Sequence, residues 1–150
     1  MKMDKNEALI TLSEQGRFWK IAFEELSAPE QVFRAVWDLE SDVNNGGFEQ
    51  YYRNSSGDTA CHVVRALTEI GARDAAGIVA RANSAFPQAS PPRDQGDREE
   101  QLEVIGPKNE DLWDSLDDEF LSYPDDLTEL LYEYVKRQRA NIEGASDVGI

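Results

Sequence analysis

The sequence predicts an all-α fold, a compact multi-helix single domain of about six to eight helices, from two features of its pattern. Apolar residues recur at helical spacing through most of the chain, and no segment shows the alternation expected of a strand. Glycine and proline interrupt the periodic segments where helices would end. A chain of 150 residues with 40% hydrophobic residues suits one packed core.

Five helical segments are expected in the first part of the chain. A region spanning Leu9 to Leu26 bends or breaks at Gly16, and the next helix begins near Pro29, a residue suited to a first turn. Residues 48–52 predict a short helix. Residues 63–70 predict a longer one that stops at glycine, and residues 75–86 predict one rich in small residues.

Residues 87–96 (PQASPPRDQG) predict a loop, because three prolines and a glycine exclude regular structure. Short helices follow around Arg98–Ile105 and Asn109–Leu121, and the last begins after Tyr123 with a clean apolar stripe. The helical domain is expected to span residues 1–142. Residues 143–150 are expected to be a frayed tail.

Charge is the strongest compositional signal. Thirty acidic residues against fifteen basic ones give a net charge of −15. Direct nucleic-acid binding is not expected, because phosphate contacts need a basic surface. A basic partner and an ordinary acidic protein are both compatible with this composition. The single cysteine, and the lack of both a secretory signal and a run of about 18 apolar residues, predict a cytoplasmic protein without a membrane segment.

The acidic residues are concentrated late in the chain. Residues 94–133 contain fifteen acids and two bases, a net of −13. In the helix predicted from Asn109, the acids share one arc of about 120° and the apolar residues share the opposite arc. This pattern predicts a surface that binds a partner, although a merely solvated helix face has the same appearance. The predicted surface consists of Glu99, Glu100, Glu103, Glu110, Asp111, Asp114, Asp117 and Asp118.

No catalytic residue, metal site or cofactor is predicted. The acids around Asp117 and Asp125 lack the spacing of a calcium loop. Cys61 and His62 are adjacent on a predicted helix, so they diverge, and no second cysteine or histidine accompanies them for zinc.

The stretch VNNGGFEQYY, residues 43–52, separates two helical segments. A phosphate-binding loop is disfavoured, because a helix rather than a strand precedes it and no lysine follows. Asparagine and glycine tolerate the left-handed backbone that ends a helix, so the stretch predicts a corner. A polar pocket formed by Asn44, Gln50 and Tyr51 is the alternative.

The longer stretch VWDLESDVNNGGFEQYYRNSSGD resembles a family of small bacterial helical domains whose best-known member is a DNA-mimic protein (the DMP, nineteen-type, family). The segment ALTEIGARDAAGIVARANSAF is also similar, and the resemblance covers roughly residues 29–140. It implies an all-α homodimer that occupies the DNA-binding face of a transcription factor or other DNA-binding protein. The motif residues, expected to be mainly structural, are Trp37, Glu40, Asn44, Asn45, Gly46, Gly47, Phe48, Gln50, Tyr51 and Asn54.

The functional expectation is therefore an acidic, non-enzymatic regulator that binds a basic DNA-binding protein. One alternative is an immunity-type or antitoxin-like inhibitor of a basic nuclease, whose acids would have the same pattern. A small-ligand or enzyme site at the NNGGF corner is a third interpretation.

Overall fold

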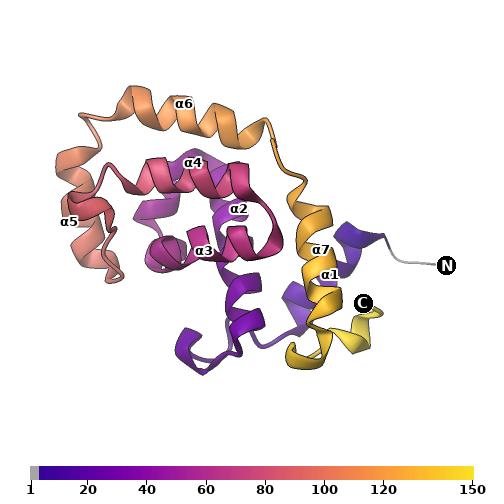
Figure 1. Cartoon of the computed structure of the whole chain (residues 1–150). Helices are drawn as coiled ribbons and strands as arrows, with labels where there is room; N and C mark the ends of the chain where they lie inside the picture. The colour runs from indigo at the N-terminus through magenta and orange to yellow at the C-terminus, as the bar shows by residue number, and fades with distance from the viewer. Residues whose placement is uncertain (1–3) are drawn as a thin grey trace. The chain divides into compact units, whose positions relative to one another are not determined.

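The computed structural model describes residues 4–150, and these residues confirm the all-α prediction (Figure 1). They form seven α-helices, five short 3-10 helices and no strand. The α-helices are α1 (Lys5–Gln15), α2 (Ala28–Arg53), α3 (Ala60–Ile70), α4 (Arg73–Asn83), α5 (Gln95–Ile105), α6 (Glu110–Leu121) and α7 (Leu127–Arg137).

The chain divides into two compact units, and the division falls within α2. The first unit combines the N-terminal residues up to Arg34 with residues 126–150, and the second comprises Ala35–Asp125. Each unit has its own buried apolar side chains.

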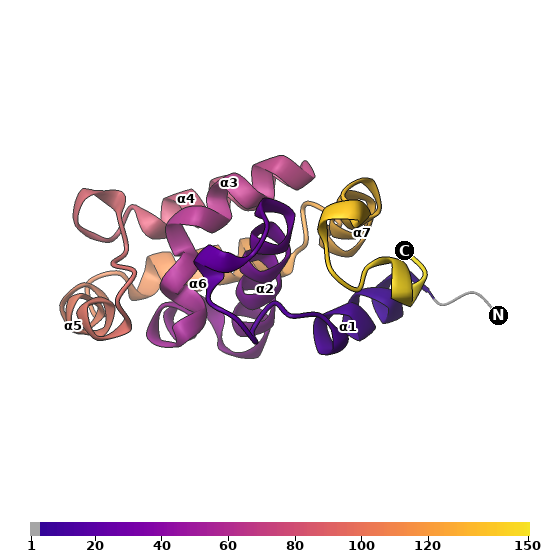
Figure 2. The ribbon, with the colours of Figure 1, turned by 90° about the horizontal axis from the view of Figure 1, so that it is seen from below.

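In the first unit, α1 packs beside α7 (Figures 1 and 2). Lys5 of α1 pairs with Glu129 of α7 at 2.6 Å, and the ring of Phe18 stacks on Phe33 with centroids 4.3 Å apart. The helical region expected from Leu9 to Leu26 is shorter than predicted. It ends at Gly16, whose backbone is extended, and only a 3-10 turn at Phe23–Glu25 follows.

Residues 143–150, which the sequence predicts to be a frayed tail, are ordered and partly buried. Residues 146–148 form a 3-10 helix, and Ile142, Ala145 and Ile150 are buried. The glycine- and acid-rich sequence is polar overall, but its few apolar side chains pack into the first unit. Burial of those side chains offsets the entropy cost of ordering the segment.

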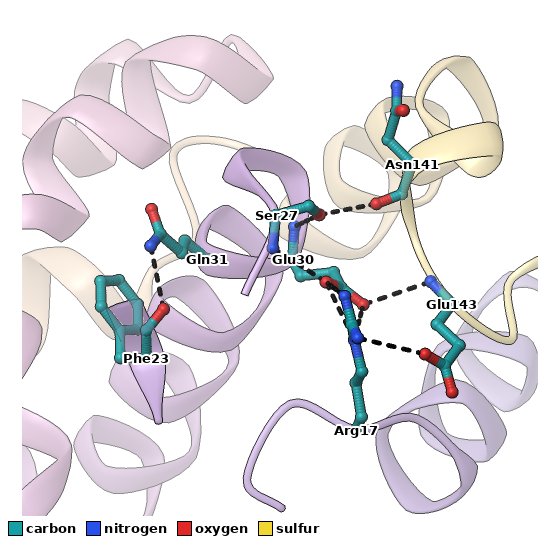
Figure 3. A network of polar contacts seen from close by, with 7 residues as sticks. All are labelled: Arg17, Phe23, Ser27, Glu30, Gln31, Asn141 and Glu143. Carbon is teal, nitrogen blue, oxygen red and sulfur yellow. Dashed lines mark hydrogen bonds and ion pairs between the residues drawn. The ribbon is translucent and has the colours of Figure 1, made fainter. Parts of the chain in front are cut away.

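Glu30 at the start of α2 organises this unit (Figure 3). Its side chain is fully buried and accepts hydrogen bonds from the Ser27 N–H at 2.9 Å and the Glu143 N–H at 3.2 Å. The Glu30 N–H donates to Ser27 Oγ in return, a reciprocal capping box. Arg17 Nη2 lies 2.8 Å from the carboxylate. Burial acts to raise the pKa of Glu30, but Arg17 and these N–H groups outweigh it and hold the pKa below its ordinary value.

In the second unit, α4 packs between α3 and α6 (Figure 1). Aromatic side chains fill its centre: the Tyr52 ring lies 4.7 Å from Phe86 and 5.6 Å from Trp113, and Phe48 meets Phe120 edge-on at 5.8 Å. The buried Tyr52 hydroxyl bonds to the Asn83 side chain at 2.6 Å. The Asn83 side chain in turn donates to the Ala60 carbonyl at 3.0 Å, so this buried pair is hydrogen-bonded as well as packed.

Arg98 of α5 is fully buried and uses all five of its N–H donors. Nε donates to the Tyr52 carbonyl at 2.6 Å, and Nη2 donates to the Asn54 carbonyl and the Asp58 carboxylate. Nη1 donates to the carbonyls of residues 92 and 93. The guanidinium thereby holds the proline-rich loop and the end of α2 against α5. The helix begins at Gln95, earlier than predicted, because Asp94 caps it.

Candidate protein-binding surface

The α6 helix has the two faces that its sequence predicts. Trp113, Leu116 and Phe120 are buried against the second unit. The carboxylates on the opposite arc are exposed: Glu110, Asp111, Asp114 and Asp118. Side chains three or four residues apart share one face of a helix, so one face packs while the other carries charge.

The α5 helix, which precedes α6 and joins it through residues 106–109, carries the remaining predicted acids (Figure 1). Glu100 and Glu103 are exposed and Glu99 is half-buried. The only base in α5 is Arg98, and it is fully buried. The exposed surface of α5 therefore has no cation of its own to offset these carboxylates.

Seven of the eight predicted acids have no partner among residues 4–150. No described side chain pairs with or hydrogen-bonds to the carboxylates of Glu99, Glu100, Glu103, Glu110, Asp111, Asp114 or Asp118. Other acids of the chain are engaged: Glu119 meets Arg81 at 2.6 Å, and Asp58 meets Arg98 at 3.0 Å. The unpaired carboxylates are free to accept charged hydrogen bonds from another molecule.

Asp117 is the exception among the eight. Its carboxylate is half-buried and accepts a hydrogen bond from the Phe48 N–H at 2.8 Å. Burial raises its pKa above the ordinary value, the Phe48 N–H acts in the opposite direction, and the neighbouring acids Asp114, Asp118 and Glu49 add to the rise. The structure therefore gives Asp117 an internal partner, unlike the other seven.

Asp117 bonds to the point where α2 bends. The backbone of Gly47 has φ 86° and ψ −177°, which interrupts the helix inside the NNGGF sequence. The Phe48 N–H then begins a new helical turn and needs an acceptor, which Asp117 supplies. A β-carbon at Gly47 would clash with this same carboxylate. The NNGGF stretch thus makes a corner, as its composition predicts.

Two groups of hydrogen bonds stabilise the corner further. Asn44 Nδ2 donates to the Glu40 carbonyl at 2.8 Å and to the Tyr123 hydroxyl at 2.6 Å, and that hydroxyl donates to the Glu40 carboxylate at 3.1 Å. Across the bend, the amides of Gln50 and Asn54 donate to the Asp42 carboxylate at 2.9 and 3.2 Å. The sequence does not predict that Asp42 and Tyr123 take part in the corner. Tyr123 lies 79 residues from Asn44, so no pattern of neighbouring residues indicates this contact.

The three residues of the alternative pocket have different surroundings. The Tyr51 ring is fully buried, and burial raises the pKa of its hydroxyl far above the ordinary value. Asn44 and Gln50 bond to different partners on the two sides of the bend. Of the remaining motif residues, Phe48 is buried, Trp37 is half-buried, and Asn45 and Gly46 are exposed.

The described residues offer neither a metal site nor a membrane-spanning helix. Among residues 4–150, no group of three or more His, Cys, Asp or Glu side chains is placed to hold a metal ion. None of the helices described is both long enough and apolar enough to cross a bilayer.

These features define a class: an all-α acidic protein in which a glycine corner in a long helix is held by an acid of the charged helix α6. The chain belongs to the family of DMP19-like proteins, whose model matches residues 24–138. A search of curated proteins and a search of solved structures each gave no match.

Proposed function

We propose that this protein is an acidic, non-enzymatic regulator that occupies the DNA-binding surface of a transcription factor or other DNA-binding protein. The observation that carries the proposal is the set of seven carboxylates on α5 and α6 that have no partner within the described part of the chain. A DNA-binding surface is rich in Arg and Lys that are spaced to meet phosphates. The unpaired carboxylates offer such cations the same kind of acceptor.

The spacing of the acids on α6 supports the proposal. Acids three to four residues apart on a helix advance roughly 4.5–6 Å along its axis. Phosphates on one DNA strand advance about 3.4 Å. The two spacings match loosely, so flexible Arg and Lys side chains would have to adapt. Complementary charge would speed the encounter and make the binding sensitive to salt.

Two further features belong to the proposal. The protein acts in the cytoplasm, where a DNA-binding partner is available, and a single exposed cysteine is compatible with that reducing compartment. It acts as a homodimer, as the family resemblance implies.

The test begins with immobilised protein and a host lysate. Bound proteins are eluted with duplex DNA or with an equal concentration of a neutral polymer, and are identified by mass spectrometry. We expect duplex DNA alone to release a DNA-binding protein. A captured protein that DNA does not displace would contradict mimicry. A captured nuclease whose activity is blocked would instead favour the immunity-type inhibitor.

A matched pair of variants tests the surface. One replaces four exposed acids of α6 by amides: Glu110→Gln, Asp111→Asn, Asp114→Asn and Asp118→Asn. The control removes four charges from exposed acids of the first unit: Glu7→Gln, Glu14→Gln, Glu25→Gln and Asp147→Asn. Both variants lose the same net charge. We expect the α6 variant to lose capture of the partner and the control to keep it. Equal losses would mean that net charge, rather than this surface, binds the partner.

A further inference from the structure

An apolar hollow lies beside the acids of α5. It has a volume of about 260 Å³ and is lined by Pro87, Glu100, Gln101, Val104 and Ile105. One wall is the exposed side of α5, and the other is the 3-10 turn that begins at Pro87. Val104 is 60% exposed, the most exposed of the large apolar side chains among the described residues.

The size of the hollow indicates what it can hold. Sites for small molecules and cofactors are usually enclosed clefts of about 300–1,000 Å³ with several convergent polar groups. This hollow is smaller and mostly apolar, and Glu100 is the one charged residue in its lining. It suits a single aliphatic or aromatic side chain, the kind of anchor that fills a pocket at a protein interface.

The charges around the hollow indicate what carries that side chain. Glu100 lies in the wall, Asp97 and Glu103 are exposed on the same helix, and Arg98 is buried away from the surface. An occupant with Arg or Lys beside its apolar anchor would complement this rim. A second copy of the chain fits less well, because a two-fold contact centred here would place acids against acids.

We propose that the α5 hollow binds one aliphatic or aromatic side chain from a basic segment of the partner protein, while Arg or Lys residues of that segment pair with Glu100 and its neighbours. The proposal rests on the proposed function and adds a contact that DNA does not imitate. Charge alone attracts many basic proteins, whereas an apolar anchor selects those that carry a fitting side chain next to their DNA-binding surface.

Defined peptides test this inference. Two short helical peptides of Lys, Arg and Ala differ at one central residue, which is Leu in the first and Ala in the second. Their affinities are measured by fluorescence anisotropy at about 0.15 M salt. We expect the Leu peptide to bind about 10-fold more tightly, as burial of a little over half the surface of its three additional carbon atoms would give. It should also shift the methyl NMR signals of Val104 and Ile105.

Two serine variants sharpen the result. Val104→Ser should abolish most of the difference between the peptides. Ile10→Ser, which alters an exposed apolar residue of α1, should preserve it. Both sites are exposed, so both variants are expected to fold.

The measurements distinguish failure of the hollow as an anchor site from failure of the acidic surface as a binding site. Equal binding of the two peptides, or unmoved methyl signals, would overturn the hollow as an anchor site while leaving the acidic surface in place. If neutralising the α6 acids abolishes the binding of both peptides, the α6 carboxylates rather than the hollow supply the binding energy, and the inference is wrong. If neither peptide binds the wild-type protein, the inference fails. A change in sedimentation of free Val104→Ser would identify a second copy as the occupant and would also overturn it.

Discussion

At the scale of single residues, Asp117 shows that an acid on a charged helix can have a structural role inside the protein. Its carboxylate accepts a hydrogen bond from the Phe48 N–H, while Asp114, one turn earlier, is exposed and has no partner among residues 4–150. The difference arises because Asp117 faces the bend of α2 at Gly47. Two aspartates of similar sequence context therefore have different physical roles.

Asp117→Ala should lower the free energy of unfolding by about 1–2 kcal/mol, because the Phe48 N–H loses its acceptor. Gly47→Ala should cost about 1–3 kcal/mol, since its backbone conformation is almost confined to glycine. Urea denaturation followed by circular dichroism measures both. Asp114→Ala is the control and should change stability by less than about 0.5 kcal/mol. Equal effects at positions 114 and 117 would contradict the capping role.

The pH dependence of this site has a definite sign. The pKa of Asp117 is raised in the folded state, chiefly by burial, so its contribution to stability is present below the unfolded pKa and lost as pH rises through the folded pKa. The stability difference between wild type and Asp117→Ala should therefore be largest below about pH 3.8, the ordinary pKa of an aspartate, and become smaller as pH rises. Chemical denaturation at a series of pH values tests this. A gap that widens with pH would contradict it.

At the scale of elements, the first turn of α2 holds three segments of the first unit together. Glu30 accepts from Ser27 and from the Glu143 backbone, and it pairs with Arg17 (Figure 3). These partners lie before α2 and near the C-terminus. The turn therefore explains why the tail is ordered.

Glu30→Ala should destabilise the protein by about 3 kcal/mol or more, because buried N–H donors and Arg17 lose their acceptor. Glu143→Ala is the control, since its bond to Glu30 comes from the backbone and its side chain is 67% exposed. That control should cost less than about 1 kcal/mol. Because the pKa of Glu30 is lowered, its contribution is present above pH 4.5 and is lost as pH falls through the folded pKa. Thermal unfolding at neutral and acidic pH measures both effects.

The acidic face of α6 should reduce the stability of its own helix. Asp114 and Asp118 repel each other at i and i+4, and Asp118 lies near the C-terminal end, where the helix dipole disfavours an anion. Asp118→Asn should therefore stabilise the protein by about 0.5 kcal/mol. Asp74→Asn is the matched control, because Asp74 lies in the first turn of α4 and its anion is favourable there. Asp74→Asn should be neutral or destabilising. Differential scanning calorimetry compares the two, and a loss of stability in Asp118→Asn would contradict the prediction.

At the scale of the whole molecule, the net charge of −15 means that the acidic side chains repel one another and destabilise the folded state. Raising NaCl from about 0.02 to 0.3 M shortens the screening length from about 20 Å to less than 10 Å. We expect Tm to rise over this range, whereas binding to a basic partner should weaken. The α6 variant without its four exposed charges should show a smaller rise. A Tm that falls with salt would mean that attractive ion pairs dominate.

The local part of the structure could be predicted from the sequence. Helical periodicity, the break before Phe48 and the two faces of α6 depend on residues within a few positions of one another. The corner followed from the backbone freedom of asparagine and glycine. For these features, the chemistry of neighbouring residues suffices.

Only the tertiary structure decided how these parts are used. It buried the one base of the acidic helix α5, Arg98, ordered the C-terminal residues around Glu30, joined Asn44 to Tyr123 and gave Asp117 an internal partner. Each contact joins residues that are far apart in the chain. Asp114 and Asp117 are the same residue type and lie one turn apart on α6. Their roles separate only when another segment packs against one of them and removes it from water.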